Sequence, residues 1–333
     1  MEKSIFKLAN ITLLFLSFSA SLHAFCNSSL CYDEIPYEEC CYDEYWDVDL
    51  SIYTGLIYGK SKEIVFEGAG SPTPYQKISI LDWDIRNLWV MGGTIEKSFF
   101  SNSLHLTVDG WGKVGSGQTT MVDRDFTDSD DPGLLTDISK SPDTHLTQAY
   151  LIDAEICYDF YNLSPWCSDL RFGFLLGYQY SKFAWKAFGG NFDYDEGADI
   201  GSFPDGELVI AYQQKFSVPY IGLNLDWQID CWELNLFGKY TCLAYAEDHD
   251  FHALRDATFI DKFNAQQYWN AGAKASWNFL GNAWLNIKYE FQRLEPAVGD
   301  TIHSEGGTTA RIRKAAGISH YQNLYSFGLT VCF

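Results

Sequence analysis

Two short stretches of the sequence carry side chains at a spacing that suits hydrolytic chemistry. In the first, "MVDRDFTDSDDPG" at residues 121–133, Asp123 and Asp125 are two positions apart, so both carboxylates lie on one side of an extended chain. Two carboxylates held this close resist double ionisation, and one of them is expected to have a raised pKa. The pair is a candidate for acid–base chemistry, and the alternative is a solvated acidic loop.

The second stretch is "AYAEDHDFHALRDATF" at residues 244–259. Asp248, Asp250 and His252 again step by two, so they share one face of an extended chain. An aspartate that accepts a hydrogen bond from one imidazole nitrogen fixes the tautomer and leaves the other nitrogen to take a proton from water. A single Asp-x-His on a surface loop is more often incidental, but its occurrence together with Asp-x-Asp favours a general-base dyad.

The segments around these stretches alternate apolar and polar residues, as strands of a membrane barrel do. In "LRFGFLLGYQY", residues 170–180, the even positions are apolar or aromatic, whereas the odd ones include arginine, glycine and glutamine. Residues 219–229 and 285–292 show the same period of two. We predict ten strands, at residues 48–66, 77–97, 103–115, 146–160, 167–186, 207–229, 231–247, 264–279, 282–296 and 319–333.

The connections between these runs alternate between short and long. Short ones such as "SNS", "SPWC" and "LGN" are typical of periplasmic turns, and long polar ones are typical of extracellular loops. The long loops are expected at residues 67–76, 116–145, 187–206, 248–263 and 297–318. The predicted fold is therefore all-β, a ten-stranded antiparallel transmembrane β-barrel with long extracellular loops and short periplasmic turns. The carboxylate pair falls on the second long loop and the Asp-x-His on the fourth.

The segment before the first strand divides into two parts. Residues 1–24 have a basic start, an apolar stretch and small residues up to Ala24, which predicts a secretory signal peptide. Residues 25–46, "FCNSSLCYDEIPYEECCYDEYW", form a Cys-rich acidic segment that we expect in the periplasm. The barrel then occupies residues 47–333.

The chain has nine cysteines, and in an oxidising compartment disulfides are expected. Cys157 and Cys167 flank a short turn and are candidates for a bridge between neighbouring strands if their Cα atoms come within about 7 Å. The four cysteines of the N-terminal segment allow disulfide cross-links between chains. Their spacing matches no standard pair of zinc ligands, so no metal is expected.

The net charge of the chain limits the classes of molecule that it is expected to bind. The formal net charge is −21, which disfavours nucleic acid and makes a cationic partner plausible. Aromatic residues make up 17% of the chain, which suits a barrel with aromatic girdles in the outer membrane.

Several long stretches of the sequence resemble the omptin family of outer-membrane aspartyl endopeptidases. The resemblance covers nearly the whole chain from about residue 50 onward, and the Cys-rich segment lies outside it. The matching stretches are "SIYTGLIYGKSKEIVF", "LDWDI", "GWGKVGSGQTTMVDRDFTDSDDPG", "TDISKSPDT", "ADIGSFPDGE", "KFSVPYIGL" and "EDHDFHALRDATF".

The resemblance implies a catalytic role for four residues. The family's carboxylate pair falls on Asp123 and Asp125, and its Asp-His dyad falls on Asp250 and His252. A water held between Asp123 and His252 would be deprotonated by His252 and would attack the scissile carbonyl, without a covalent intermediate, a metal or another cofactor. Asp125 would help to position the site and, if protonated, donate to the developing oxyanion.

The resemblance also implies the substrate class. The family cuts beside basic residues, and its acidic pocket maps to Glu63 and Asp248. Two carboxylates around one guanidinium give charge-assisted hydrogen bonds, so basic peptides and proteins are the expected substrates, with dibasic sites preferred. Asp137 matches an acidic position that would favour a second basic residue after the cut. The alternative for Glu63 is a solvated ion pair with Lys60 or Lys62.

Family members need lipopolysaccharide, and the contact positions fall on Tyr178, Tyr180, Lys182 and Lys215. By parity these side chains lie on the outer wall, where cations suit phosphate; the alternative is snorkelling of interfacial lysines. The sequence departs from the family pattern here, because the family has arginine at both lysine positions and an acid at Tyr180. Lysine loses bidentate phosphate recognition, so the dependence on the lipid is expected to differ.

Phe251 is a further departure, because an acidic residue is usual between the dyad's two members. It is expected to point away from the dyad, so catalysis need not suffer.

We expect a monomer in the outer membrane, with its active site facing the exterior. One alternative is an omptin-like barrel with weak or no activity that acts as an adhesin or a disulfide-linked envelope scaffold. A porin is disfavoured because ten strands give a narrow barrel whose charged interior residues, such as Arg171, Lys288 and Glu290, could plug it. A soluble aspartic protease is disfavoured because its Asp-Thr/Ser-Gly motif is missing.

Self-cleavage is predicted at Arg313-Lys314.

Overall fold

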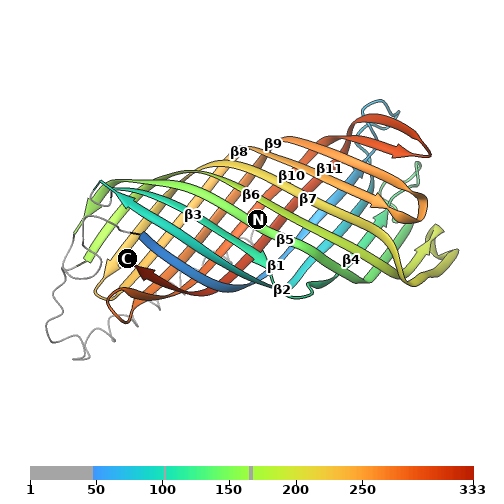
Figure 1. Cartoon of the computed structure of the whole chain (residues 1–333). Helices are drawn as coiled ribbons and strands as arrows, with labels where there is room; N and C mark the ends of the chain where they lie inside the picture. Colours follow the sequence, from blue (N-terminus) through green and yellow to red (C-terminus); the bar gives the residue numbers. More distant parts are fainter. Residues whose placement is uncertain (1–47, 101–102, 165–167) are drawn as a thin grey trace, which may run out of the picture. The chain divides into compact units, whose positions relative to one another are not determined.

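The computed structural model describes residues 48–100, 103–164 and 168–333, and these residues form antiparallel β-sheet almost throughout (Figure 1). The predicted signal peptide at 1–24 and the Cys-rich segment at 25–46 lie outside the described residues. The strands are β1 (Val48–Phe66), β2 (Lys77–Phe99), β3 (Leu104–Lys113), β4 (Gln118–Asp125), β5 (Asp137–Leu163), β6 (Ser168–Tyr194), β7 (Asp199–Ile229), β8 (Trp232–His252), β9 (Ala257–Asn278), β10 (Ala283–Glu305) and β11 (Thr308–Cys332). Two short 3-10 turns, η1 (Asp195–Gly197) and η2 (Ala253–Arg255), connect β6 to β7 and β8 to β9.

The sheet closes on itself, because β1 pairs with both β11 and β2. β3 and β4 occupy the same place in the ring: β3 pairs with residues 90–99 of β2, and β4 pairs with residues 79–83 of the same strand. The break between them contains Gly115 and Gly117, whose φ angles of +84° and +58° suit glycine. The eleven strands of the described residues therefore fill ten positions, which confirms the ten-stranded antiparallel barrel.

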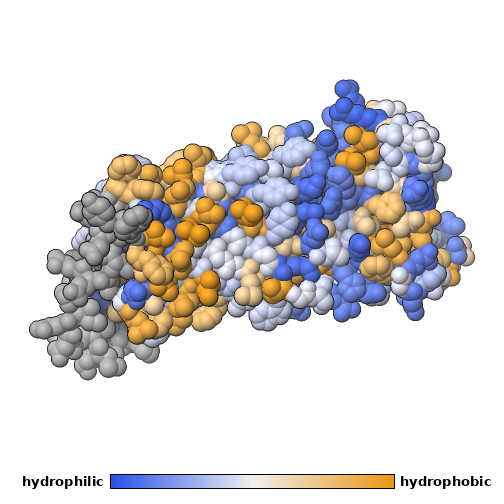
Figure 2. Space-filling model, viewed as in Figure 1, coloured by the Kyte–Doolittle hydropathy of each residue, from blue (hydrophilic) through white to orange (hydrophobic). Residues whose placement is uncertain are grey.

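Alternation sets the inside and the outside of this barrel. On β6, Phe174 and Leu176 are exposed while Leu175 between them is buried, and on β7 Ile221 and Leu223 are exposed while Tyr220 is buried. Figure 2 shows apolar residues gathered over the part of the barrel nearer the C-terminus, and hydrophilic ones over much of the part beyond it. The apolar belt is the surface that a bilayer would cover, because it surrounds strands whose backbone hydrogen bonds are all made within the ring. No helix of the described residues has the length and apolar character needed to cross a membrane.

The strands extend further from the belt than predicted, which is a correction to the expected loops. Most residues of the segments 116–145, 187–206, 248–263 and 297–318 continue the sheet as the outer ends of β4 to β11. The connections at this end shrink to residues 126–136, 195–198, 253–256 and 306–307. Beyond the belt both faces of a strand meet polar surroundings, so apolar alternation disappears although the backbone ladder continues. The acidic residues assigned to loops two and four therefore lie on β4 and β8.

Side chains fill the lumen at the level of the belt. Lys239 lies 2.9 Å from a carboxylate oxygen of Asp153 and 2.7 Å from one of Glu155, and Lys288 lies 2.6 Å from Glu290. Buried amides continue this network, with Gln179 hydrogen-bonded to Gln292 across the barrel. The interior is a packed polar core, in keeping with the expectation that charged residues plug the barrel.

The predicted bridge between Cys157 and Cys167 is wrong. Cys157 on β5 is a thiol directed at a carboxylate oxygen of Asp159, 3.5 Å away. In the register of β5 with β6 it lies opposite Leu175, seven positions beyond the start of β6 at Ser168. At about 3.3 Å per residue this separation is far beyond the reach of a disulfide. Cys167 itself lies outside the described residues.

Candidate active site

The carboxylate pair and the Asp-His dyad reach one another through the lumen. Asp123 and Asp125 stand on β4, while Asp250 and His252 stand on β8, which is not a neighbour of β4 in the sheet. All four side chains nevertheless interact electrostatically: His252 acts on both members of the pair, and Asp250 acts on Asp123. The structure therefore brings the four predicted catalytic residues together inside the outer half of the barrel.

The dyad is a close contact between a buried and an accessible group. Nε2 of His252 lies 2.5 Å from Oδ2 of Asp250. The Asp250 side chain is 1% exposed, whereas that of His252 is 23% exposed. The His252 ring also packs edge-on against Phe259 at 5.4 Å between centroids. These contacts fix the imidazole and leave part of it open to the lumen, as a general base requires.

Phe251 is part of β8 between the members of the dyad. The side chains of a strand alternate between its two faces, so Phe251 points away from Asp250 and His252. The expectation for its orientation is thus confirmed.

Opposing contacts set the pKa of the Asp123 carboxyl. Ser79 Oγ on β2 donates a hydrogen bond of 2.9 Å to Asp123 Oδ1. Burial, and then the neighbouring Asp125, raise the pKa of Asp123 to about 7, while the Ser79 hydrogen bond and His252 act against the rise. Burial also raises the pKa of Asp125, and Asp137 adds to this effect. The pair therefore retains a proton more readily than two solvated aspartates would.

Glu63 and Asp248 face the lumen beside the dyad. Glu63 on β1 is 3% exposed and Asp248 on β8 is 0% exposed. Burial is the main cause that raises the pKa of both carboxyls, and the carboxyls around them, Asp250 and Asp261 among them, add to it. Asp248 accepts a 2.9 Å hydrogen bond from the Tyr212 hydroxyl. The two predicted pocket residues are therefore close, buried and without a cation among the ion pairs of the described residues.

The alternative for Glu63, a solvated partner of Lys60 or Lys62, is wrong. Both lysines point to the outer wall, where Lys60 lies 3.3 Å and Lys62 lies 3.6 Å from carboxylate oxygens of Asp82. Arg124 joins the same outer cluster at 2.9 Å from Asp82. Because side chains alternate along β1, these cations and Glu63 lie on opposite sides of the wall.

An aromatic layer lies next to the acidic residues. Trp83 and Tyr212 stack with ring centroids 5.0 Å apart, and Trp185 packs against both at about 6 Å. Gln214 donates a 2.6 Å hydrogen bond to the Tyr212 hydroxyl, which in turn donates to Asp248. The layer holds the Asp248 carboxylate and lowers its access to water.

Asp137 lies at the rim, at the start of β5, directly opposite Asp125 in the register of β4 with β5. Its Oδ1 accepts the backbone N–H of Asp195 at 3.0 Å, and its Oδ2 accepts the Thr136 hydroxyl at 2.7 Å. These bonds tie the ends of two strands together and keep the carboxylate partly exposed. Asp137 is therefore near the carboxylate pair, next to Asp125.

The predicted lipid contacts lie on the outer wall. Tyr178 and Lys182 project outward from β6, and Lys182 is directly opposite Lys215 of β7. Lys215 also lies 3.1 Å from Glu247. Tyr180 packs near Tyr150, with 6.1 Å between ring centroids. The four residues therefore share the outer face of the neighbouring strands β6 and β7.

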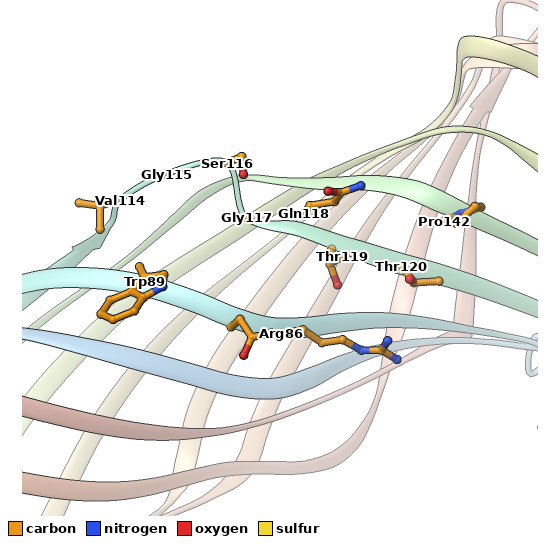
Figure 3. A pocket seen from close by; sticks show the side chains of 11 residues that line it. Arg86, Trp89, Val114, Gly115, Ser116, Gly117, Gln118, Thr119, Thr120 and Pro142 are labelled. Carbon is orange, nitrogen blue, oxygen red and sulfur yellow. The ribbon is translucent and has the colours of Figure 1, made fainter.

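A pocket also opens at the break between β3 and β4 (Figure 3). It is lined by Arg86, Asn87, Trp89, Pro142 and residues 114–120. None of the candidate site residues lines it, and Arg86 there is ion-paired with Asp84. It is therefore separate from the acidic site in the lumen.

Sequence reasoning missed three residues of the site. Ser79, Tyr212 and Asp261 all face the lumen and contact predicted site residues. Asp261 belongs to no sequence motif. It is identified only by the pairing register of β8 with β9, which places it opposite Asp248. The described residues contain no group of three or more His, Cys, Asp or Glu side chains placed to hold a metal ion.

Comparison with known proteins agrees with this architecture. The family model described as the Omptin family matches residues 44–333. The plasminogen activator of Yersinia pestis is 32% identical over 286 residues, which cover 84% of this chain and 88% of the relative. Protease 7 of Escherichia coli K12 is 32% identical over 300 residues, which cover 86% of this chain and 90% of the relative.

A solved structure shows the same fold. The crystal structure of the outer membrane protease OmpT from Escherichia coli superimposes with a TM-score of 0.81 at 30% identity, covering 92% of this chain and all of that one. These likenesses support an outer-membrane protease function. The chain belongs to the omptin family and is an outer-membrane β-barrel protein.

Proposed function

We propose that the protein is an endopeptidase that cleaves peptides and proteins next to basic residues, using a water activated between Asp123 and His252. The observation that carries the proposal is the meeting, within one lumen, of a tightly bonded Asp-His dyad, a carboxylate pair and a buried acidic pocket. The dyad bond of 2.5 Å orients the imidazole. The exposure of His252 leaves room for a water molecule on its open side.

The proposed reaction needs no covalent intermediate. His252 removes a proton from the water, which Asp123 holds by accepting a hydrogen bond, and the hydroxide attacks the scissile carbonyl carbon. Asp125, when protonated, donates to the oxygen on which negative charge develops. His252 then passes its proton to the leaving amine as the C–N bond breaks. The two products are an amine and a carboxylic acid, which releases its proton to solvent, and His252 returns to its neutral form.

The acidic pocket would select the residue before the cut. Glu63 and Asp248 are buried carboxylates with one unpartnered oxygen each, Oε2 and Oδ1. A buried anion without a partner is costly, so a guanidinium or ammonium group from the substrate would be strongly favoured there. Asp137, at the rim beside Asp125, would favour a second basic residue after the cut. Dibasic sites are therefore the preferred substrates.

Lipopolysaccharide is proposed as a required lipid rather than a cofactor in the reaction. Lys182 and Lys215 are like charges placed directly opposite one another, and such a pair favours an anion between them. Glu247 neutralises only part of this charge. Phosphate groups of the lipid would complete the site, with Tyr178 against the sugar and acyl parts. The strand ends that carry the catalytic groups would then face the cell exterior, and the barrel would act as a monomer.

Cleavage of a quenched Ala-Arg-Arg-Ala peptide by refolded protein tests this proposal. We expect cutting between the arginines that requires lipopolysaccharide and is lost in both Asp123→Ala and His252→Ala. The matched control is Asp130→Ala, an exposed aspartate of the same acidic stretch. A folded barrel that cuts nothing under any lipid condition would contradict the proposal and favour an adhesin or an envelope scaffold.

A further inference from the structure

The acidic pocket contains a third carboxyl, Asp261, that sequence motifs do not indicate. Asp261 on β9 is directly opposite Asp248 on β8, and its side chain is 4% exposed. The two carboxyls are close enough to share a hydrogen bond, and Thr301 on β10 also hydrogen-bonds to Asp261. The charge of Asp261 also acts on Glu63, which approaches from β1. Glu63, Asp248 and Asp261 thus form one cluster, which we call the triple-acid pocket.

Each member of the triple-acid pocket has one oxygen that lacks a partner. Glu63 Oε2, Asp248 Oδ1 and Asp261 Oδ1 are all buried, and apart from the proton that the two aspartates can share none of them receives a hydrogen bond from the described residues. None of the three carboxylates forms an ion pair with a Lys, Arg or His of the described residues, although Asp250 beside them is paired with His252. Burial without a cation is costly for carboxylates, and the pocket is therefore incomplete until a cationic group enters it.

Lysine and arginine differ in how many carboxylates they need when their charged groups are buried. A lysine ammonium is a compact, strongly hydrated charge with three N–H donors, and burial away from water requires a partner for each. A guanidinium has five N–H donors but is planar and more weakly hydrated, so a bidentate contact with one carboxylate plus a single bond to another leaves its remaining N–H groups at a smaller cost. Two carboxylates therefore suffice for arginine, whereas a third benefits lysine more.

We propose that Asp261 is a specificity-determining residue that lets the pocket accept lysine as well as arginine before the cleaved bond. This inference rests on the proposed peptidase function of the same site and goes beyond it by naming the residue that sets the lysine preference. Asp261 receives the ammonium together with Glu63 and Asp248, while Tyr212 and Thr301 hold the carboxyls in place. It takes no part in the movement of protons during hydrolysis.

The test compares peptides Ala-X-Arg-Ala in which X is arginine, lysine or the uncharged norleucine, with products identified by mass. The variants are Asp261→Asn and, as a matched control, Asp256→Asn, which makes the same change at an exposed position of the same hairpin. In Asp261→Asn we expect the lysine-to-arginine ratio of kcat/KM to fall about tenfold, chiefly through KM, because one charge-assisted hydrogen bond is lost. The control should leave the ratio unchanged.

Binding provides a readout that does not need cleavage. The same peptides are titrated into the Asp123→Ala background, with and without Asp261→Asn, and followed by the fluorescence of the buried Trp83 and Trp185 near Asp248. The lysine peptide should lose about tenfold more affinity than the arginine peptide. Failure of the wild type to cut any peptide would count against the proposed function, whereas the binding ratio would still decide the role of Asp261.

Equal losses for lysine and arginine, in kcat/KM or in affinity, would overturn the inference. That result would mean that Asp261 only positions Asp248. An unchanged ratio with full activity would also overturn it, because the third carboxyl would then have no influence on the substrate.

Discussion

Nε2 of His252 and Oδ2 of Asp250 lie 2.5 Å apart, and only the histidine is accessible from the lumen. Their positions on β8 are two residues apart, so the strand itself aligns them, and no loop closure is needed to form the contact. Across the lumen, β4 presents Asp123 and Asp125 with the same spacing. Two rigid strands thus supply both halves of the proposed catalytic group.

Removal of the Ser79 hydroxyl is expected to alter the pH dependence of activity. Its hydrogen bond to Asp123 lowers the pKa of that carboxyl, which stands at about 7. Ser79→Ala should raise this pKa further, so a reaction that needs ionised Asp123 would require a higher pH. We expect the acidic limb of the kcat/KM profile to move toward higher pH, by about half a unit to one unit.

The control for this change is Ser141→Ala. Ser141 is buried like Ser79, but its hydroxyl donates to the backbone oxygen of Gly189 rather than to a carboxylate. A profile that shifts equally in both variants, or in neither, would show that the Ser79 bond does not tune Asp123.

Asp261→Asn is expected to stabilise the barrel at high pH but not at low pH. Burial raises the pKa of Asp261 from 3.8 to about 6, so the folded protein holds this proton more tightly than the unfolded chain does. Folded-state stability is therefore lost as the pH rises from about 4 to 6, and the penalty is complete above that range. Asparagine removes the penalty, worth at most about 3 kcal/mol.

The measurement is the melting temperature in detergent at pH 3.5 and pH 8. The variant should melt higher than the wild type at pH 8 and at a similar temperature at pH 3.5. A gain of equal size at both values would refute the electrostatic explanation.

The lipid site predicts a separate effect on activation. Lys182→Ala combined with Lys215→Ala should raise the lipopolysaccharide concentration needed for half-maximal activity by roughly tenfold to thirtyfold, since each lysine near an anionic surface contributes about 1 kcal/mol. The rate at saturating lipid should change little, because neither side chain reaches the lumen. Lys186→Ala, an exposed lysine on the same face of β6, is the control and should leave the activation curve in place.

Self-cleavage is expected between Arg313 and Lys314. Both residues are exposed near the tip of the β10–β11 hairpin, where the register shifts and Lys314 has a φ of +54°. Intact mass after prolonged incubation should reveal a cut there that depends on protein concentration and is missing in His252→Ala. A persistently intact wild type that still cuts peptides would show that the strand pairing and the bond from Lys314 N to Asp300 protect the site.

The sequence predicted the barrel because a membrane imposes strong contrast between the faces of a strand. Ile221 and Leu223 alternate with Gly222 and Asn224, and this contrast defined the strand at that level. The outer extensions show no such contrast, because both faces of the strand meet polar surroundings there, so the sequence predicts loops. Asp248 falls in one of these predicted loops, although it lies well inside β8.

The site was predictable where spacing within one strand was sufficient, as for Asp250 and His252. It was not predictable where the contact depends on the register between strands. Asp261 lies opposite Asp248 only because β8 and β9 pair through the tight turn at residues 253–256, and "TFIDKF" carries no signal of that pairing. Tyr212 was missed for the same reason, since its role follows from its place across from Asp250 on β7.

The most direct test of the account measures kcat for dibasic peptide cleavage in Asp123→Asn, His252→Gln and the double variant, at saturating lipopolysaccharide. If the two residues hold and activate one water, each single change should lower kcat by about a thousandfold, and the double variant should be no slower than the worse single one. Losses that multiply in the double variant, or substantial activity left in either single variant, would contradict the proposal that Asp123 and His252 share the attacking water.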